Sequence, residues 1–265
     1  MIDRITKQPF CQTRVSGSTF VNADCFDVFP FIEDKSIDAI ICDLPYGTTA
    51  CKWDSVLPFD KLWKEYERVI KPNGAIVLFG SQPFTSALVM SNPKLFKYEW
   101  IWDKKTSTGG VLAKKRPMKA HENILVFNSA TYNPQMGVWE EDLIKRMSKK
   151  RYLGKPKTEM MHSEHLVCNK EDKLERGKYP QSVLRINGIA RPSGEGGLHP
   201  TQKSLQLLEY LVKTYTNEGE IVLDNCMGSN TTGLACQRLN RQFIGIEKEK
   251  AYYDISVKRL SETLF

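Results

Sequence analysis

The chain contains 265 residues, of which 41% are hydrophobic and 26% charged, and its formal net charge is +7. This length supports one substantial domain with an inserted segment, and the basic balance suits a polyanionic partner without requiring one. No stretch reaches the roughly 18 apolar residues of a membrane span, and Met1–Phe10 lacks the apolar core of a secretory signal. We therefore expect no membrane association and a cytoplasmic location.

Cysteines and histidines give no sign of a disulfide framework or a metal centre. The seven cysteines are scattered and form no Cys-x-x-Cys pair, which favours reduced thiols. His162 and His165 have no cysteine or carboxylate partner at ligand spacing, so we predict no metal site.

Strand and helix signals alternate through the first half of the chain. Short apolar, β-branched runs predict strands, and helically spaced apolar residues bounded by Pro and Gly predict helices. The expected strands are Ile37–Cys42, Ala75–Phe79, Tyr98–Trp102 and Asn123–Phe127, and the expected helices are Phe59–Ile70 and Pro83–Met90. This alternation indicates an α/β fold with a mostly parallel sheet and helices on both faces.

The segment Asn133–Leu198 is long, polar and poorly periodic. A structureless insertion of this size is unusual inside a compact domain, so it is either a small subdomain or a mobile functional loop. Its basic run could contact phosphates, but a solvated charged face would also explain it. The run consists of Lys145, Arg146, Lys149, Lys150, Arg151, Lys155 and Lys157.

The α/β pattern resumes after His199. The expected helices are Leu205–Tyr215, Thr231–Leu239 and Ala251–Leu260, and the expected strands are Glu220–Leu223 and Phe243–Ile246.

Two carboxylates follow the strands of this second half. Asp224 opens a tight turn of small residues, Asn225–Asn230, and Glu247 ends the next strand. Ligands of doubly wound sheets bind at such strand ends, where helix N–H groups are free and a carboxylate can accept hydrogen bonds from ribose hydroxyls. The pair favours a nucleoside cofactor, with an ordinary turn and a surface Glu247 as the alternative.

A second constellation, Asp43-Leu44-Pro45-Tyr46, follows the strand Ile37–Cys42. The Asp43 carboxylate and the Leu44 carbonyl, held extended by the following proline, can each accept one N–H of an amino group on a planar ring. Tyr46 can stack on that ring. A strand followed by a proline turn, with Tyr46 in the core, is equally compatible with these four residues.

Together these elements resemble the β group of amino-methyltransferases, the circularly permuted class in which the catalytic motif precedes the cofactor motif. Asp43–Tyr46 is similar to the family's Asp-Pro-Pro-Tyr, His199–Lys203 to its His-Pro-Thr-Gln-Lys-Pro element, and Val222–Gly233 to its cofactor loop. Glu247 matches the ribose-binding acid, and Asn22–Cys25 is similar to the stretch whose Asp meets the cofactor's adenine.

The resemblance, which covers residues 18–132 and 180–260, implies a Rossmann-like fold that binds S-adenosylmethionine and flips a base out of double-stranded DNA. It implies a permuted catalytic domain of residues 1–132 and 199–265 and a target-recognition insertion of residues 133–198. The cofactor-binding residues that it implies are Asp24, Cys25, His199, Thr201, Lys203, Asp224, Cys226, Met227, Gly228, Ser229, Asn230, Thr231, Thr232 and Glu247.

DNA contacts are expected from two basic segments. The loop Asp103–Lys119 would line a DNA channel, although a mobile surface hairpin is an alternative, and the insertion would contact phosphates and base edges. The residues concerned are Lys104, Lys105, Lys114, Lys115, Arg116, Lys149, Lys150 and Arg151. A homodimer and a cognate restriction endonuclease are further expected partners, in a bacterial or phage-infected cell.

Four residues depart from the family pattern, of which Ser204, in place of the proline after Lys203, is a minor change. Leu44 replaces a proline whose carbonyl rather than ring is used, and Cys226 stands where a phenylalanine usually packs beside the cofactor. Asn230 replaces a glycine, but asparagine tolerates left-handed backbone, so the loop can close with cofactor affinity as the property at risk.

The resemblance implies direct methyl transfer to an exocyclic amino nitrogen, with alignment and hydrogen bonding as the protein's contribution. In the family, Asp at the first motif position goes mostly with N6 of adenine and Ser with N4 of cytosine, so Asp43 favours adenine. No Pro-Cys pair is present to supply the nucleophile of C5 methylation. The alternatives are N4-cytosine methylation, methylation of RNA or a protein side chain, and a degenerate fold that only binds DNA.

Overall fold

The computed structural model describes residues 4–5, 7–15, 17–48, 54–137, 177–188 and 202–262. The chain divides into two compact units, one of Met1–Asn133 with Ser182–Phe265 and the other of Pro134–Gln181. In the described part of the second unit, an antiparallel bridge joins Gly137 and Lys178. The functional division at residues 133 and 198 stays a prediction, and all elements named below belong to the first unit.

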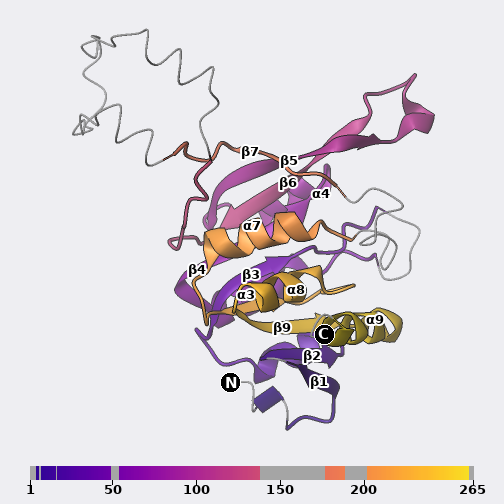
Figure 1. Ribbon diagram of the computed structural model, residues 1–265. Coiled ribbons are helices and arrows are strands. Elements are labelled where there is room, and N and C mark those ends of the chain that lie inside the picture. The colour runs from indigo at the N-terminus through magenta and orange to yellow at the C-terminus, as the bar shows by residue number, and fades with distance from the viewer. Residues whose placement is uncertain are drawn as a thin grey trace. The chain divides into compact units, whose positions relative to one another are not determined.

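The first unit is built on one sheet, which has nine strands within the described residues, in the order β1-β2-β9-β8-β3-β4-β6-β5-β7 (Figure 1). The strands are β1 (Cys11–Val15), β2 (Ser18–Asn22), β3 (Ile37–Cys42), β4 (Ile70–Gly80), β5 (Phe96–Thr108), β6 (Lys119–Phe127), β7 (Val183–Arg185), β8 (Ile221–Asp224) and β9 (Gln242–Glu247). From β2 to β4 the strands run parallel, whereas β1 and β6 are antiparallel to their neighbours. The carboxyl ends of the parallel strands therefore meet at one edge.

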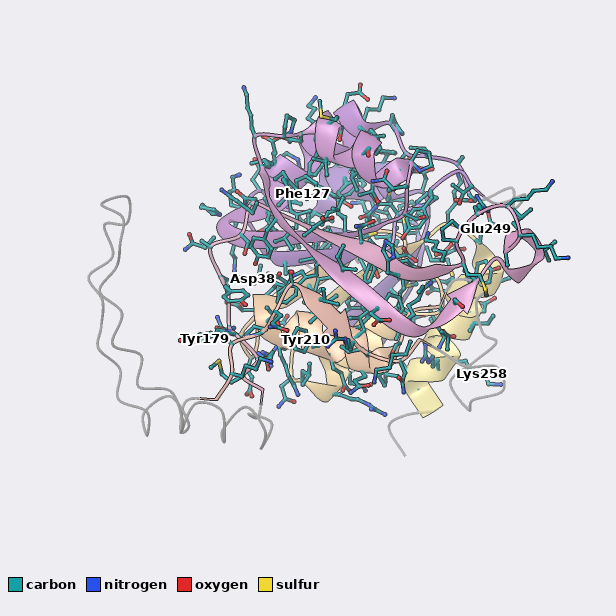
Figure 2. All side chains as sticks on the ribbon, turned by 90° about the horizontal axis from the view of Figure 1, so that it is seen from above. Asp38, Phe127, Tyr179, Tyr210, Glu249 and Lys258 are labelled. Carbon is teal, nitrogen blue, oxygen red and sulfur yellow. The ribbon has the colours of Figure 1, made fainter. Side chains whose placement is uncertain are left out.

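Helices cover both faces of the sheet (Figures 1 and 2). One face carries α2 (Cys25–Val28), α3 (Phe59–Val69) and α4 (Phe84–Ser91), and the other carries α7 (Leu205–Tyr215), α8 (Thr231–Arg238) and α9 (Lys250–Glu262). Along β3, Ile40 and Cys42 pack into the core beneath α2, α3 and α4, while Ala39 and Ile41 pack into the core beneath α7, α8 and α9. The apolar run in β3 is continuous because a parallel strand covered on both faces buries alternate side chains in both cores.

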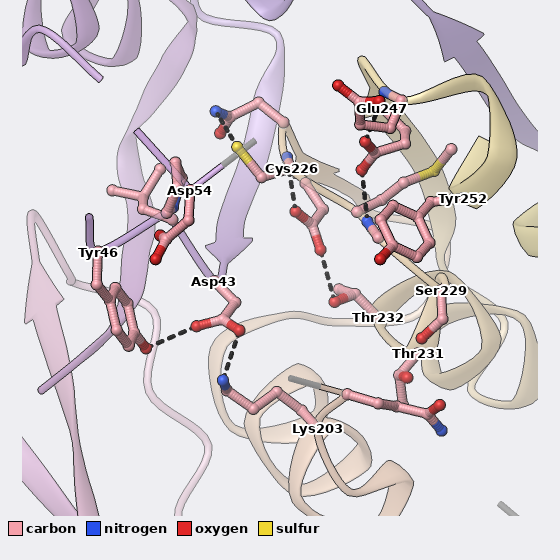
Figure 3. A pocket seen from close by; sticks show the side chains of 18 of the residues that line it. Asp43, Tyr46, Asp54, Lys203, Cys226, Ser229, Thr231, Thr232, Glu247 and Tyr252 are labelled. Atoms are coloured by element: carbon pink, nitrogen blue, oxygen red, sulfur yellow. Dashed lines mark hydrogen bonds and ion pairs between the residues drawn. The ribbon is translucent and has the colours of Figure 1, made fainter. Parts of the chain in front are cut away.

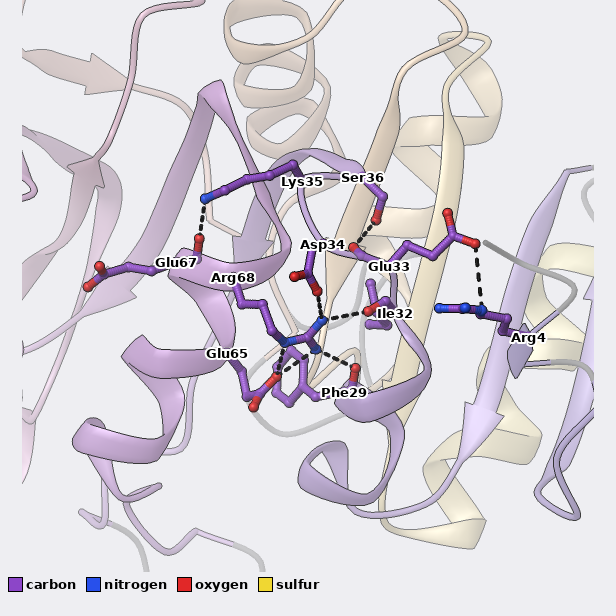
Figure 4. A network of polar contacts seen from close by, with 10 residues as sticks. All are labelled: Arg4, Phe29, Ile32, Glu33, Asp34, Lys35, Ser36, Glu65, Glu67 and Arg68. Carbon is purple, nitrogen blue, oxygen red and sulfur yellow. Dashed lines mark hydrogen bonds and ion pairs between the residues drawn. The ribbon is translucent and has the colours of Figure 1, made fainter.

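Arg68, near the end of α3, holds the segment that leads into β3 (Figure 4). Its guanidinium donates to the carbonyl oxygens of Phe29 and Ile32 at 2.7 and 2.8 Å. It also pairs with Asp34 and Glu65 at 2.6 Å each. A planar group with several donors can satisfy these acceptors together, so Arg68 ties the start of β3 to α3.

The predicted α/β class and the main predicted elements are confirmed. β3 and α7 have the predicted bounds, and the other predicted strands and helices occur with shifted ends. The stretch Asp103–Lys119 is a hairpin rather than an irregular loop, since β5 and β6 extend into it around a 3-10 turn at Gly110–Leu112. None of the helices in the described residues combines the length and apolar character needed to cross a membrane.

Candidate active site

Three parallel strands that lie side by side, β9, β8 and β3, end at the same edge of the sheet. Asp43 directly follows β3, Asp224 is the last residue of β8, and Glu247 is the last residue of β9. A cavity of about 670 Å³ opens at this edge, and all three carboxylates line it together with Asp24 and Lys203. Figure 3 shows Asp43, Lys203 and Glu247 around it. Its volume lies in the range of sites that take small-molecule ligands.

Glu247 is held in the cavity wall by two backbone amides. Its carboxylate oxygens accept hydrogen bonds from the N–H groups of Gly228 and Glu249, both at 2.9 Å. Burial raises the pKa of Glu247 despite these two donors. Nearby, Asp24 caps α2 through the N–H of Phe26 and pairs with Lys248 at 3.0 Å. Two oriented acids at this end suit the hydroxyl and amino groups of a nucleoside.

The turn between β8 and α8 closes around the Asn230 side chain. Asn230 has the left-handed φ of 63°, and its side chain is fully buried. Its Oδ1 lies 2.0 Å from the position that a β-carbon on Gly233 would take, so only glycine fits there. Asn230 therefore supports the turn from beneath and does not line the cavity. The predicted cofactor-loop residues that do line it are Asp224, Cys226, Met227, Gly228, Ser229, Thr231 and Thr232.

Asp224 is a buried acid with two neutral donors. It accepts from the Cys226 N–H at 3.1 Å and from the Thr232 hydroxyl at 2.8 Å. Burial raises the pKa of Asp224 to about 6, against the effect of these hydrogen bonds. A positive group in the cavity would favour its ionised form. The residues thus fit a ligand that carries both a positive charge and ribose hydroxyls, as S-adenosylmethionine does.

Asp43 lies across the cavity from Glu247 and is held by two donors (Figure 3). The Tyr46 hydroxyl donates to Oδ1 at 2.6 Å, and Lys203 Nζ donates to Oδ2 at 2.5 Å. Burial raises the pKa of Asp43, and Lys203 opposes that shift. The Tyr46 ring stacks on Phe84 with centroids 4.9 Å apart, while Leu44 and Pro45 also line the cavity. The acceptor carboxylate and the aromatic ring of the motif are therefore brought together at the strand end.

Three residues around this motif escape the sequence predictions. Asp54 accepts hydrogen bonds from the N–H groups of Gly47 and Thr48, both at 2.9 Å, and so orders the turn after Tyr46. Phe84 packs on Tyr46, and Glu122 of β6 lies 3.4 Å from Lys203. Each is isolated in the sequence, so no local pattern could identify it.

The predicted DNA-binding residues divide into separate groups. Lys105, Lys114, Lys115 and Arg116 are exposed on the β5–β6 hairpin. Lys104 instead lines the cavity, where its side chain is 15% exposed and pairs with Glu122 at 2.7 Å. The predicted residues that lie outside the described ones are Lys149, Lys150, Arg151, His199 and Thr201.

Comparison with known proteins gives a consistent set of relatives. The family described as DNA methylase matches residues 37–258. The type II methyltransferase M.HpaI of Haemophilus parainfluenzae is 31% identical over 239 residues, which cover 86% of this chain and 69% of that protein. The type II methyltransferase M1.MboII of Moraxella bovis is 28% identical over 248 residues, which cover 86% of this chain and 91% of that protein.

Solved structures show the same likeness. The crystal structure of the M1.HpyAVI–SAM complex has a TM-score of 0.59 at 27% identity, over 91% of this chain and 99% of that chain. The cytosine-N4-specific PvuII DNA methyltransferase has a TM-score of 0.64 at 15% identity, over 94% of this chain and 91% of that chain, which is a likeness of fold.

Proposed function

The chain belongs to the DNA methylase family, and from this premise we propose that it methylates N6 of adenine at a specific site in double-stranded DNA. The relatives of the chain are type II DNA methyltransferases, which supports the same class for this chain. The family includes enzymes for N6 of adenine and for N4 of cytosine, so membership does not identify the target base. S-adenosyl-L-methionine is the methyl donor.

The observation that supports this proposal most directly is the cavity shared by Asp43, Asp224 and Glu247. We assign the Glu247 and Asp224 side, with Asp24 and the Gly228 turn, to the methyl donor. We assign the Asp43–Tyr46 side to a base flipped out of the duplex. A single cavity for both suits direct transfer, because the reacting atoms must meet in line without an intermediate carrier.

The proposed chemistry uses the chain's residues for alignment and proton transfer. S-adenosyl-L-methionine supplies an electrophilic methyl group on a sulfonium with a neutral leaving group. The Asp43 carboxylate and the Leu44 carbonyl each accept one N–H of the target amino group, which raises the lone-pair density on its nitrogen. Methylation makes that nitrogen acidic, and Asp43 accepts the released proton because burial raises its pKa.

DNA binding is proposed to involve both basic segments. Lys105, Lys114, Lys115 and Arg116 on the exposed hairpin would contact phosphates, while the insertion of residues 133–198 would read the recognition sequence. We also propose a homodimer and a cognate restriction endonuclease that shares the recognition site. We propose that this methyltransferase acts on DNA in the cytoplasm of a bacterial or phage-infected cell.

Nucleoside analysis tests the target base. The purified protein is incubated with S-adenosyl-L-methionine and unmethylated duplex DNA, which is then digested and analysed by mass spectrometry. We expect N6-methyladenine, because Asp43 occupies the motif position at which the family's adenine enzymes mostly carry Asp. N4-methylcytosine alone would overturn the adenine assignment and leave the family intact. Cofactor-independent DNA binding without any methylated nucleoside would support the binding-only alternative.

Asp43→Asn tests the proposed acceptor, since it keeps the side-chain shape but removes the charge. We expect kcat to fall by about 10²–10⁴-fold while the affinity for S-adenosyl-L-methionine stays within about twofold. Asp60→Asn, exposed on α3, is the matched control and should keep full activity. Near wild-type turnover in Asp43→Asn would remove Asp43 from the mechanism.

A further inference from the structure

Asp43 is the first member of a row of four alternating charges in the cavity wall. Lys203 Nζ lies 2.5 Å from Asp43 Oδ2 and 3.4 Å from Glu122 Oε2. The other oxygen of Glu122 accepts a hydrogen bond from Lys104 Nζ at 2.7 Å. The side chains of Asp43, Lys203, Glu122 and Lys104 are 22%, 9%, 14% and 15% exposed, so solvent screens them weakly.

The order of charges in this row determines how strongly Lys203 acts on Asp43. A buried lysine paired with Asp43 alone would neutralise that carboxylate and weaken it as an acceptor. Glu122 attracts the same ammonium group from its other side, so Lys203 is shared between two carboxylates. The contact between Glu122 Oε2 and Lys203 Nζ is an ion pair at 3.4 Å, so Glu122 acts on Lys203 chiefly through its charge.

We infer that Glu122 is a positioning residue for methyl transfer, because it shares the Lys203 ammonium with Asp43 and so keeps Asp43 a strong acceptor for the amino group. The inference rests on the proposed role of Asp43. Glu122 lies on β6 and belongs to none of the sequence motifs. Lys203 links it to Asp43, and its negative charge also acts on Asp43 directly.

Asp43 is faced by titratable groups from every element around it. These are Tyr46 of its own turn, Lys203 before α7, Glu122 of β6, Asp224 at the end of β8 and Cys226 after it; Lys104 of β5 and Lys119 of β6 act in turn on Glu122, and Cys42 of β3 acts on Tyr46. Burial raises the pKa of Asp43, Lys203 lowers it, and Glu122 raises it. Although burial opposes the shift, Lys203 and Lys104 lower the pKa of Glu122 to about 2, so Glu122 is ionised wherever the enzyme works.

The dependence of kcat on pH tests this inference, because two substitutions should move its acid limb in opposite directions. Glu122→Gln removes a negative neighbour of Asp43, so the acid limb should move to lower pH and kcat should fall about tenfold. Lys203→Met removes a positive neighbour, so its acid limb should move to higher pH. Glu99→Gln, on the neighbouring strand β5 and outside the cavity lining, is the control and should keep the wild-type profile.

A second pair of variants separates charge from shape. Glu122→Asp keeps the charge and should retain the acid limb of the wild type, whereas Glu122→Asn should shift it as Glu122→Gln does. An unmoved limb in both neutral variants would overturn the inference, as would their failure to fold when Glu122→Asp folds, since that would show a structural role. Wild-type protein without any methylated product would instead contradict the proposed function.

Discussion

The environment of Asp224 disfavours its ionised form, and a positively charged ligand would favour that form. Burial raises the pKa of Asp224 to about 6, and the groups that donate to it, Cys226 N–H, Thr232 Oγ1 and the Cys42 thiol, are neutral. Because this pKa lies above the ordinary value of 3.8, the native state binds more protons than the unfolded chain between these two pH values. Stability therefore falls as the pH rises through that window. A cation bound beside Asp224 lowers the pKa of this residue again, because it stabilises the ionised carboxylate.

We expect the affinity for S-adenosyl-L-methionine to decrease as the pH falls below about 6, because protonation of Asp224 removes the charge that attracts the sulfonium. Calorimetric titration between about pH 5 and about pH 8 measures this dependence, with a loss approaching tenfold per pH unit at the acid end. Asp224→Asn is the control, which should bind weakly with an affinity that does not vary over the same range. A constant wild-type affinity would show that Asp224 does not face the cation.

Sequence predicts the cavity residues that belong to local patterns and misses those that arrive from elsewhere. A carboxylate directly after a buried strand is such a pattern, which is why Asp43, Asp224 and Glu247 can be located in advance. Glu122 and Asp54 look like ordinary surface acids until the pairing of β6 with β4 and the fold of the turn after Tyr46 bring them inward. Their contribution depends on tertiary structure alone.

At the scale of elements, the β5–β6 hairpin connects the cavity with an exposed basic tip. Thr106 and Thr108 line the cavity, and Lys114, Lys115 and Arg116 follow on the exposed end. Replacing these three basic residues by Ala should weaken binding to all DNA sequences and reduce the salt slope of the affinity by up to about 3, since each phosphate contact contributes about 0.9. Fluorescence anisotropy over a range of salt concentrations measures both effects.

The control for the hairpin triple variant removes the same charge from exposed residues outside the hairpin. Lys61 and Lys64 on α3 and Lys94 after α4 are exposed and lie outside the cavity lining, so their replacement by Ala should leave the slope nearly unchanged. Equal slopes in the two triple variants would show that net charge, rather than the hairpin, attracts DNA.

Elements with a continuous buried face are predictable from this sequence, and partly exposed ones are not. β3 and α7 are buried along most of their length, so their apolar patterns mark their ends. The outer end of β5, from Lys105 to Thr108, is exposed and polar, and its sequence alone does not distinguish a strand from a loop. β7 and α2 are too short, at three and four residues, for a period to be recognised.

At the scale of the whole molecule, the cavity joins two distant parts of the chain. β3 comes from the first third of the sequence and pairs with β8 from the last third, so the two strand ends that carry Asp43 and Asp224 meet only when these distant segments have paired in the folded sheet. A ligand that binds across this edge binds only the folded chain, and its binding free energy adds to the stability of the whole unit.

Saturating S-adenosyl-L-methionine should therefore raise the melting temperature. At a concentration of about 100 times Kd the added stability is about 2.7 kcal/mol, which corresponds to roughly 5–10 °C for a domain of this size. Glu247→Gln should lose most of this shift. The carboxylate now accepts hydrogen bonds from two backbone N–H groups, and the amide NH₂ of glutamine would face one of these donors without being able to accept from it. Asp43→Asn should keep the shift, since Asp43 is assigned to the base. Scanning calorimetry of the wild type and the two variants, with and without S-adenosyl-L-methionine, measures the shift in melting temperature. An equal loss of that shift in both variants would mean that the cavity is not divided between a methyl-donor side and a base side.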